Sequence, residues 1–239
     1  MLLISQALQH VNARIAQACA QAQRPGNAVT LLAVSKTFSA EAVISAIEAG
    51  QRDFGENYVQ EGIEKIAQVA SCCARRAISA NALPIWHFIG PLQSNKARQV
   101  AQYFNWVHSI DRLKIAYRLS AYRPVHWPAL NVCLQVNISQ EATKSGFSAN
   151  DVIVAAQEIS QLPGLRLRGL MCIPQPTQKE AEQRYTFAQL RRIFELIRGK
   201  GLALDTLSMG MSNDFEAAIL EGATIVRVGS AIFGKREGF

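Results

Sequence analysis

The sequence predicts an α/β fold: a single (β/α)8 barrel of the TIM type, in which eight parallel strands alternate with helices. Short apolar runs alternate with segments whose apolar residues recur at helical spacing, which is typical of parallel strands joined by helical crossovers. The chain has 239 residues, enough for eight such units, and no linker or low-complexity segment divides it. We therefore expect one domain over residues 1–239.

An open, doubly wound sheet is the alternative fold for this alternation. Its first strand would lead into a Gly-x-Gly-x-x-Gly turn. The sequence has Ser35-Lys36-Thr37 at that place instead. Eight strand–helix units in a chain of this length also favour closure into a barrel.

The first half of the chain is expected to hold an N-terminal helix and four strand–helix units. Leu8, Val11, Ile15 and Cys19 recur at helical spacing and predict the amphipathic first helix. Residues 71–84 show no periodicity and are expected to form a surface loop. Strands are predicted at residues 29–37, 52–54, 84–90 and 106–109, and helices at 39–50, 59–66, 97–104 and 111–121.

The second half repeats the alternation. Ser148, followed three residues later by Asp151, resembles a capping box at a helix start. Residues 139–147 are expected to connect that helix to the preceding strand. Strands are predicted at residues 130–138, 165–171, 204–208 and 224–228, and helices at 148–162, 179–198 and 213–220.

A lone lysine, Lys36, closes the first apolar strand. The end of a buried strand is a costly place for an ammonium group, which must be solvated or paired. Partial desolvation favours the neutral amine, and a neutral amine is a nucleophile toward aldehydes. The alternative is that Lys36 extends into solvent and has no chemical role.

Two glycine-containing loops follow the seventh and eighth strands, where barrels of this kind often bind phosphate. They are Ser208-Met-Gly-Met-Ser212-Asn213 and Arg227-Val-Gly229-Ser230-Ala-Ile-Phe-Gly234. Glycine lets backbone amides approach an anion, and the two serines add hydroxyl donors. Each loop alone is equally consistent with an ordinary turn. Together with a lysine at the same mouth of the barrel, they form the kind of site that holds pyridoxal 5'-phosphate (PLP).

The composition narrows the classes of function. Apolar residues make up 49% and charged residues 18%, which excludes a disordered chain. The net charge of +7 permits an RNA-binding protein, but the basic residues are dispersed, so we expect an anionic small molecule rather than nucleic acid. Five irregularly spaced cysteines without a Cys-x-x-Cys pair indicate a reducing, cytoplasmic location and neither disulfides nor a metal site. No apolar run reaches transmembrane length.

Five segments resemble the pyridoxal phosphate homeostasis protein family (YggS/PROSC-like), and the likeness extends over essentially the whole chain. The resemblance implies a fold type III PLP-binding barrel related to the N-terminal domain of alanine racemase. It also implies a role in vitamin B6 homeostasis. The segments are Leu31–Thr37, Phe54–Glu61, Trp86–Lys96, Ser208–Glu216 and Val226–Gly234.

The resemblance also implies roles for single residues. PLP would be held as a Schiff base on Lys36, and Arg227 would face the pyridine nitrogen. A guanidinium group has only donors, so that nitrogen would accept and stay unprotonated, which makes the ring a weaker electron sink. Asn57 is expected to line the cofactor ring, with capping of its own loop as the alternative. The predicted cofactor-binding residues are Lys36, Asn57, Ser212, Arg227, Gly229 and Ser230, and no catalytic or metal-binding residue is predicted. His87 is interpreted as a core residue or as one that supports a site residue, with a catalytic role as the alternative, and His108 is interpreted as a packing residue.

The function expected from these features is binding of PLP for intracellular homeostasis, with little or no catalysis. The alternative is a racemase-like enzyme that uses Lys36 as one base. Racemisation needs a second base on the opposite face, which in alanine racemase comes from an additional β-domain, and we expect that domain to be absent because the chain stops soon after Gly234. We expect a cytoplasmic monomer whose candidate recipients are apo-enzymes that need PLP.

Overall fold

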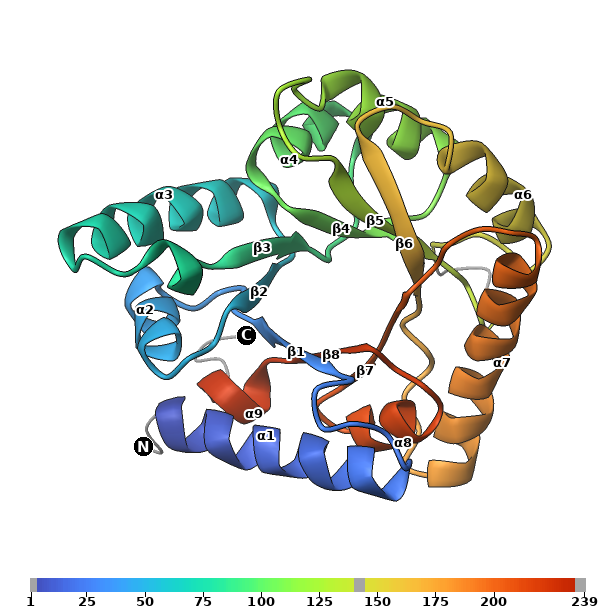
Figure 1. Cartoon of the computed structure of the whole chain (residues 1–239), viewed down its shortest axis with the longest axis horizontal. Coiled ribbons are helices and arrows are strands. Elements are labelled where there is room, and N and C mark those ends of the chain that lie inside the picture. The colour runs from blue at the N-terminus through green and yellow to red at the C-terminus, as the bar shows by residue number, and fades with distance from the viewer. Residues whose placement is uncertain (1–3, 140–144, 235–239) are drawn as a thin grey trace.

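The computed structural model describes residues 4–139 and 145–234, and these residues form a closed barrel of eight parallel strands (Figure 1). Each strand pairs with the next along the chain, and the last strand pairs with the first. The closed order confirms the predicted barrel and excludes the open sheet. The strands are β1 (Thr30–Val34), β2 (Asp53–Glu56), β3 (Ile85–Phe88), β4 (Trp106–Ile110), β5 (Leu130–Gln135), β6 (Leu165–Met171), β7 (Thr206–Met211) and β8 (Ile225–Val228).

Helices surround the barrel (Figure 1). Helix α1 packs against α2, α8 and α9, so it contacts helices from both ends of the sequence. The helices are α1 (Ile4–Gln21), α2 (Ala40–Glu48), α3 (Val59–Arg75), α4 (Ala97–Tyr103), α5 (Leu113–Tyr122), α6 (Asp151–Ile159), α7 (Glu180–Gly199), α8 (Phe215–Leu220) and α9 (Ser230–Phe233), with 3-10 turns at Ala80–Ala82 and Ser94–Lys96. None of the helices within the described ranges is long and apolar enough to cross a membrane.

The alternation of side chains along the strands separates an outer core from the barrel interior. Leu31 and Ala33 of β1 belong to the large apolar core that the helices share. Leu32 points to the opposite face and packs with Ile225 and Ile89 in a smaller cluster inside the barrel. The interior is therefore only partly apolar, and polar side chains from other strands occupy the rest of it.

Several element ends follow the predicted signals. The buried stripe of α1 contains all four residues named for it. Ser39 caps α2 by accepting a hydrogen bond from the Ala42 amide at 3.3 Å. The Ser148 hydroxyl donates to the Asp151 carboxylate at 2.6 Å and accepts from the Asp151 amide, so the two residues contact each other where α6 begins, although the N-cap residue of α6 is Asn150. Strand β6 has the predicted bounds.

Other predicted bounds are wrong. Strand β1 ends at Val34, so Lys36 lies in a turn, where Thr37 adopts a left-handed φ of +68°. Strand β7 continues to Met211, because a bulge around Gly210, at φ +92°, keeps Ser208-Met-Gly-Met in the sheet. Helix α3 runs on to Arg75, into the predicted loop 71–84. The short helix α9 was not predicted.

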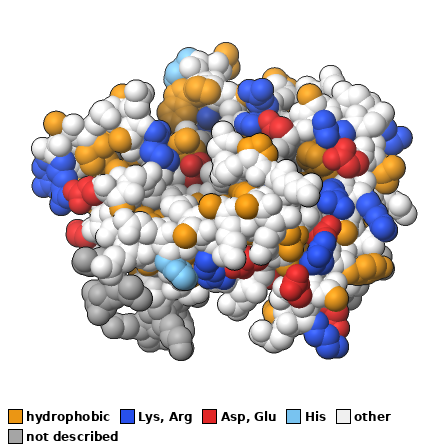
Figure 2. All heavy atoms as spheres, turned by 60° about the horizontal axis from the view of Figure 1, so that its bottom comes forward, with side chains coloured by type: hydrophobic (Ala, Val, Ile, Leu, Met, Phe, Trp, Pro, Cys, Tyr) orange, Lys and Arg blue, Asp and Glu red, His pale blue; other side chains and the backbone are white. Residues whose placement is uncertain are grey.

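Two predicted ranges extend beyond the described residues. Residues 1–3 and 235–239 of the domain 1–239 lie outside them, and so do residues 140–144 of the connection 139–147. Within the described ranges, no two of the five cysteines form a disulfide. On the face shown in Figure 2, basic side chains are interspersed with acidic ones and do not form one continuous patch.

Candidate functional site

A cavity of about 240 Å³ opens where the strands end, at the carboxyl side of the barrel. All six residues predicted to bind a cofactor line this cavity, although they come from four different strand–helix connections and from β8. The structure therefore brings the predicted site together. Its lining consists of Lys36, Asn57, Ser212, Arg227, Gly229 and Ser230, with Val34, Phe38, Ile89, Ile173, Met211 and Gly234 supplying the remaining wall.

Lys36 is half-buried and is flanked by two anchored residues. On one side, the Ser35 hydroxyl donates to Glu56 Oε1 at 2.6 Å, and Lys65 Nζ donates to the Ser35 carbonyl at 2.6 Å. On the other side, the Thr37 amide donates to Glu61 Oε1 at 2.5 Å. The turn that carries Lys36 is thus fixed at both neighbouring backbone positions.

The anchoring groups form a buried ionic cluster behind the turn. Lys65 Nζ lies 2.7 Å from Glu56 Oε1 and 2.8 Å from Glu61 Oε1. Glu56 is fully buried and Lys65 is 5% exposed. Burial raises the pKa of Glu56, and the ammonium group of Lys65 opposes that rise. Sequence reasoning missed this cluster, whose only local signal is the i,i+4 spacing of Glu61 and Lys65 on α3.

Arg227 reaches the cavity from inside the barrel. Its Nη1 donates to the Ser208 hydroxyl and its Nη2 to the Cys172 carbonyl, both at 2.8 Å. Burial lowers the pKa of the guanidinium group, but a guanidinium stays charged in proteins. The side chain is therefore a fixed cationic donor at the floor of the site.

The two predicted serines meet at the opposite wall. Ser230 Oγ and Ser212 Oγ are 3.3 Å apart, although one follows β8 and the other β7. Gly229 packs against the end of β1, where a Cβ atom at this position would lie 3.1 Å from the Val34 carbonyl oxygen. The Asp214 carboxylate accepts a hydrogen bond from the Met211 amide at 2.6 Å and so fixes the turn that carries Ser212. This wall presents two hydroxyl groups, which can donate hydrogen bonds to an anion.

Asn57 contributes a buried polar atom to the site. Its side-chain Oδ1 is buried and has no hydrogen-bond partner among the described residues. Gly90 permits this placement, because a Cβ atom at Gly90 would overlap the Asn57 carbonyl oxygen at 2.1 Å. Buried polar atoms are rarely left without a partner, so a ligand donor is the expected one.

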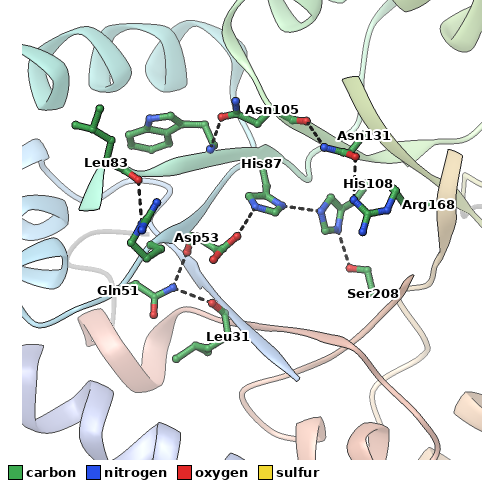
Figure 3. Close-up of polar contacts among 12 residues, drawn as sticks. Leu31, Gln51, Asp53, Leu83, His87, Asn105, His108, Asn131, Arg168 and Ser208 are labelled. Atoms are coloured by element: carbon green, nitrogen blue, oxygen red, sulfur yellow. Dashed lines mark hydrogen bonds and ion pairs between the residues drawn. The ribbon is translucent and has the colours of Figure 1, made fainter. Parts of the chain in front are cut away.

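Sequence reasoning also missed a row of polar groups inside the barrel (Figure 3). His87 and His108 are buried, as expected of core residues, yet both rings are hydrogen-bonded and do not simply pack. The four inner members share a position in the structure, where His87, His108, Ser208 and Arg227 are the third residues of β3, β4, β7 and β8. Within the described ranges, no group of three or more His, Cys, Asp or Glu side chains is placed to hold a metal ion.

Comparison with known proteins gives one consistent family. The family described as "Alanine racemase, N-terminal domain" matches residues 6–237. A pyridoxal phosphate homeostasis protein of Pseudomonas aeruginosa is 55% identical over 99% of this chain and 97% of its own length. PipY of Synechococcus elongatus, solved with PLP bound, is 38% identical with a TM-score of 0.77, over 92% of this chain and all of that one.

A more distant structure shares the fold alone. Alanine racemase of Corynebacterium glutamicum is 15% identical, with a TM-score of 0.67. The match covers 97% of the present chain but 62% of the racemase.

Proposed function

The chain belongs to the alanine racemase N-terminal domain family, and from that membership we propose that it binds PLP and serves intracellular PLP homeostasis, with little or no turnover of its own. The observation that carries the proposal is the meeting of Lys36, Arg227 and the Ser212–Ser230 pair around one cavity. The name of the Pseudomonas relative and the PLP-bound structure of PipY support it.

The residues present fit the cofactor. The cavity offers an amine for an aldehyde, a cationic donor for a ring nitrogen and hydroxyl donors for a phosphate. The unpaired, buried Oδ1 atom of Asn57 adds an acceptor for a polar group on the ring. When bound, PLP supplies a reactive aldehyde on an electron-withdrawing ring.

In this proposal Lys36 holds the aldehyde as a Schiff base, and Arg227 donates to the pyridine nitrogen. Because a guanidinium cannot accept a proton, Arg227 keeps that nitrogen unprotonated, which limits how well the ring stabilises a carbanion. The anchored turn around Lys36 fixes the amine, and Gly229, Ser212 and Ser230 bind the phosphate. This set favours storage and delivery of the cofactor over turnover.

The wider setting is part of the same proposal. We place the protein in the cytoplasm as a monomeric, single-domain barrel over residues 1–239. Its five cysteines, which form no disulfide within the described ranges, are consistent with a reducing compartment. Apo-enzymes that require PLP are the proposed recipients. A racemase-like activity is the alternative, and it would need a second base opposite Lys36.

The test is reconstitution of the purified protein with PLP, followed by an absorption spectrum, borohydride reduction and peptide mass mapping. We expect a yellow protein with the pyridoxyl mass on Lys36. Deuterium exchange at the α-carbon of added amino acids then separates a carrier from an enzyme. A protein that stays colourless at saturating PLP would overturn the proposal.

Replacing the serine pair is expected to weaken retention of PLP. Ser212→Ala and Ser230→Ala should each cost about 0.5–1.5 kcal/mol of binding free energy if the hydrogen bond is neutral, and more if it is to a charged phosphate. Equilibrium dialysis measures the change. Ser160→Ala, at the end of α6, is the matched control. Unchanged affinity in the double variant would remove both hydroxyls from the site.

Arg227→Glu is expected to shift the absorption band of bound PLP, because a carboxylate beside the ring nitrogen favours its protonated form. Arg227→Gln, which is neutral, is the matched control and should shift the band less. Spectra at equal occupancy measure the difference. Identical spectra for the two variants and the wild type would show that residue 227 does not contact the ring nitrogen.

A further inference from the structure

A chain of hydrogen bonds crosses the barrel from the end opposite the cavity. Figure 3 shows it from Asp53 to Ser208, and the Ser208 hydroxyl also accepts a hydrogen bond from Arg227. We infer that Asp53, His87, His108 and Ser208 form a relay with one fixed direction of donation, and that this relay positions Arg227. The direction of hydrogen-bond donation depends only on residues of the protein. The effect of the relay on a bound PLP ring rests on the proposed function.

The relay consists of four contacts between five strands. His87 Nε2 lies 3.0 Å from Asp53 Oδ1, at the start of β2. His87 Nδ1 lies 2.9 Å from His108 Nε2, and His108 Nδ1 lies 2.7 Å from Ser208 Oγ. Arg227 Nη1 completes the row at 2.8 Å from the same hydroxyl. Asp53 is 20% exposed, whereas the inner members are buried.

The chemistry of the two ends allows one direction only. A carboxylate accepts and a guanidinium donates. Burial lowers the pKa of both imidazoles, so each ring is neutral and carries one N–H. His87 must place that proton on Nε2 to face Asp53, because two acceptors would otherwise meet. Its Nδ1 then accepts from His108.

The same reasoning continues to the far end. With its proton on Nε2, His108 accepts at Nδ1 from the Ser208 hydroxyl. The Ser208 hydroxyl therefore donates its proton to His108, and the lone pairs of the Ser208 oxygen accept the hydrogen bond from Arg227. Asp53, at the amino end of the barrel, thus determines which way the hydroxyl under Arg227 points.

Neighbouring aromatic groups hold the relay in place. The Trp106 ring stacks on His87 with a centroid separation of 5.3 Å and an interplanar angle of 10°. The Arg168 guanidinium lies 4.7 Å from the Trp106 centroid. This packing leaves His87 little freedom to rotate, so reversal of the relay requires a change of tautomer and not of rotamer.

The first experiment reads the tautomers directly in cofactor-free protein. In the His10→Gln/His126→Gln variant, which removes two exposed histidines, long-range ¹H–¹⁵N spectra report only on His87 and His108. We expect both rings to carry the proton on Nε2 and none on Nδ1. A proton on Nδ1 of either ring would overturn the fixed direction, whether or not the protein binds PLP.

The second experiment tests the positioning of Arg227. In the same cofactor-free protein, the ¹⁵Nη signals of Arg227 are expected to be separate, because two hydrogen bonds hinder rotation of the guanidinium. Ser208→Ala should merge them, whereas Ser208→Thr, which keeps the hydroxyl, should not. Merged signals in the wild type, or separate signals in Ser208→Ala, would overturn the positioning role.

The third experiment connects the relay to the ligand. Ser208→Ala is expected to raise the Kd for PLP about 2- to 10-fold, the value of one hydrogen bond. Asp53→Asn should change it in the same direction by a smaller factor. Glu182→Gln removes an exposed carboxylate that pairs with Lys179 at the start of α7, away from the relay, and should leave the Kd unchanged. Equal Kd values for Ser208→Ala and the wild type would show that the relay does not act on the ligand.

Discussion

Lys36→Ala is expected to abolish covalent attachment of PLP and to leave the barrel folded. Lys36 lines the cavity from the turn after β1 and belongs to neither apolar cluster of the core. Alanine therefore removes the nucleophile without opening a void among packed side chains. The remaining contacts to phosphate and ring would hold PLP only reversibly, so desalting should release it.

The measurement compares absorption before and after desalting, followed by borohydride reduction and mass mapping. Lys96→Ala is the matched control, since Lys96 lines a neighbouring pocket and not the cavity of Lys36. The control should retain the pyridoxyl mass on Lys36. A stable pyridoxyl mass on another lysine in Lys36→Ala would assign the attachment elsewhere.

Lys65→Met is expected to produce the largest loss of stability, about 3–5 kcal/mol, as for other buried ion pairs broken on one side. Glu56 is fully buried, and its Oε2 already lacks a hydrogen-bond partner among the described residues. Without Lys65, only the Ser35 hydroxyl would remain on that carboxylate. Urea unfolding measures the loss, and Lys114→Met, on the exposed side of α5, is the control.

Two further measurements separate an unpaired charge from lost packing. Adding Glu56→Gln to Lys65→Met removes the charge and should recover part of the stability. Burial raises the pKa of Glu56, and loss of Lys65 raises it further, so the folded variant binds a proton that the unfolded chain does not. Stability should then increase as pH falls, and the deficit should be smaller near about pH 5 than near about pH 8. A deficit independent of pH would indicate packing instead.

The features that the sequence predicted well are those whose signal is periodic. Leu31 and Ala33 alternate with Leu32 because the two faces of β1 contact different apolar clusters. An alternation of this kind can be recognised in the sequence alone. The ends of strands were harder to predict from the sequence. In Met209-Gly210-Met211 the glycine resembles a turn, whereas it forms a bulge that continues β7. In α3, Val69 and Cys73 are buried at i,i+4 spacing, which marks the helical continuation that was missed.

The polar contacts behind the site were not predictable in this way. His108 and Ser208 are separated by 100 residues, and Ser35 and Lys65 by 30. A pairing over such distances depends on strand order and register, which exist only once the barrel has closed. Five of the six predicted cavity residues lie directly after a strand, and a parallel barrel brings the carboxyl ends of all its strands to one rim. Arg227 lies within β8 instead, and its role was expected from the family resemblance.

The pairing of β1 with β8 joins the first and last strands of the chain. Lys36 follows β1 and Ser230 follows β8, so the amine and the proposed phosphate donors face each other across that seam. A partly synthesised chain holds the amine without the donors and lacks a complete pocket. A ligand that contacts both sides therefore binds only the barrel in which β1 and β8 are paired. Its binding free energy stabilises that pairing.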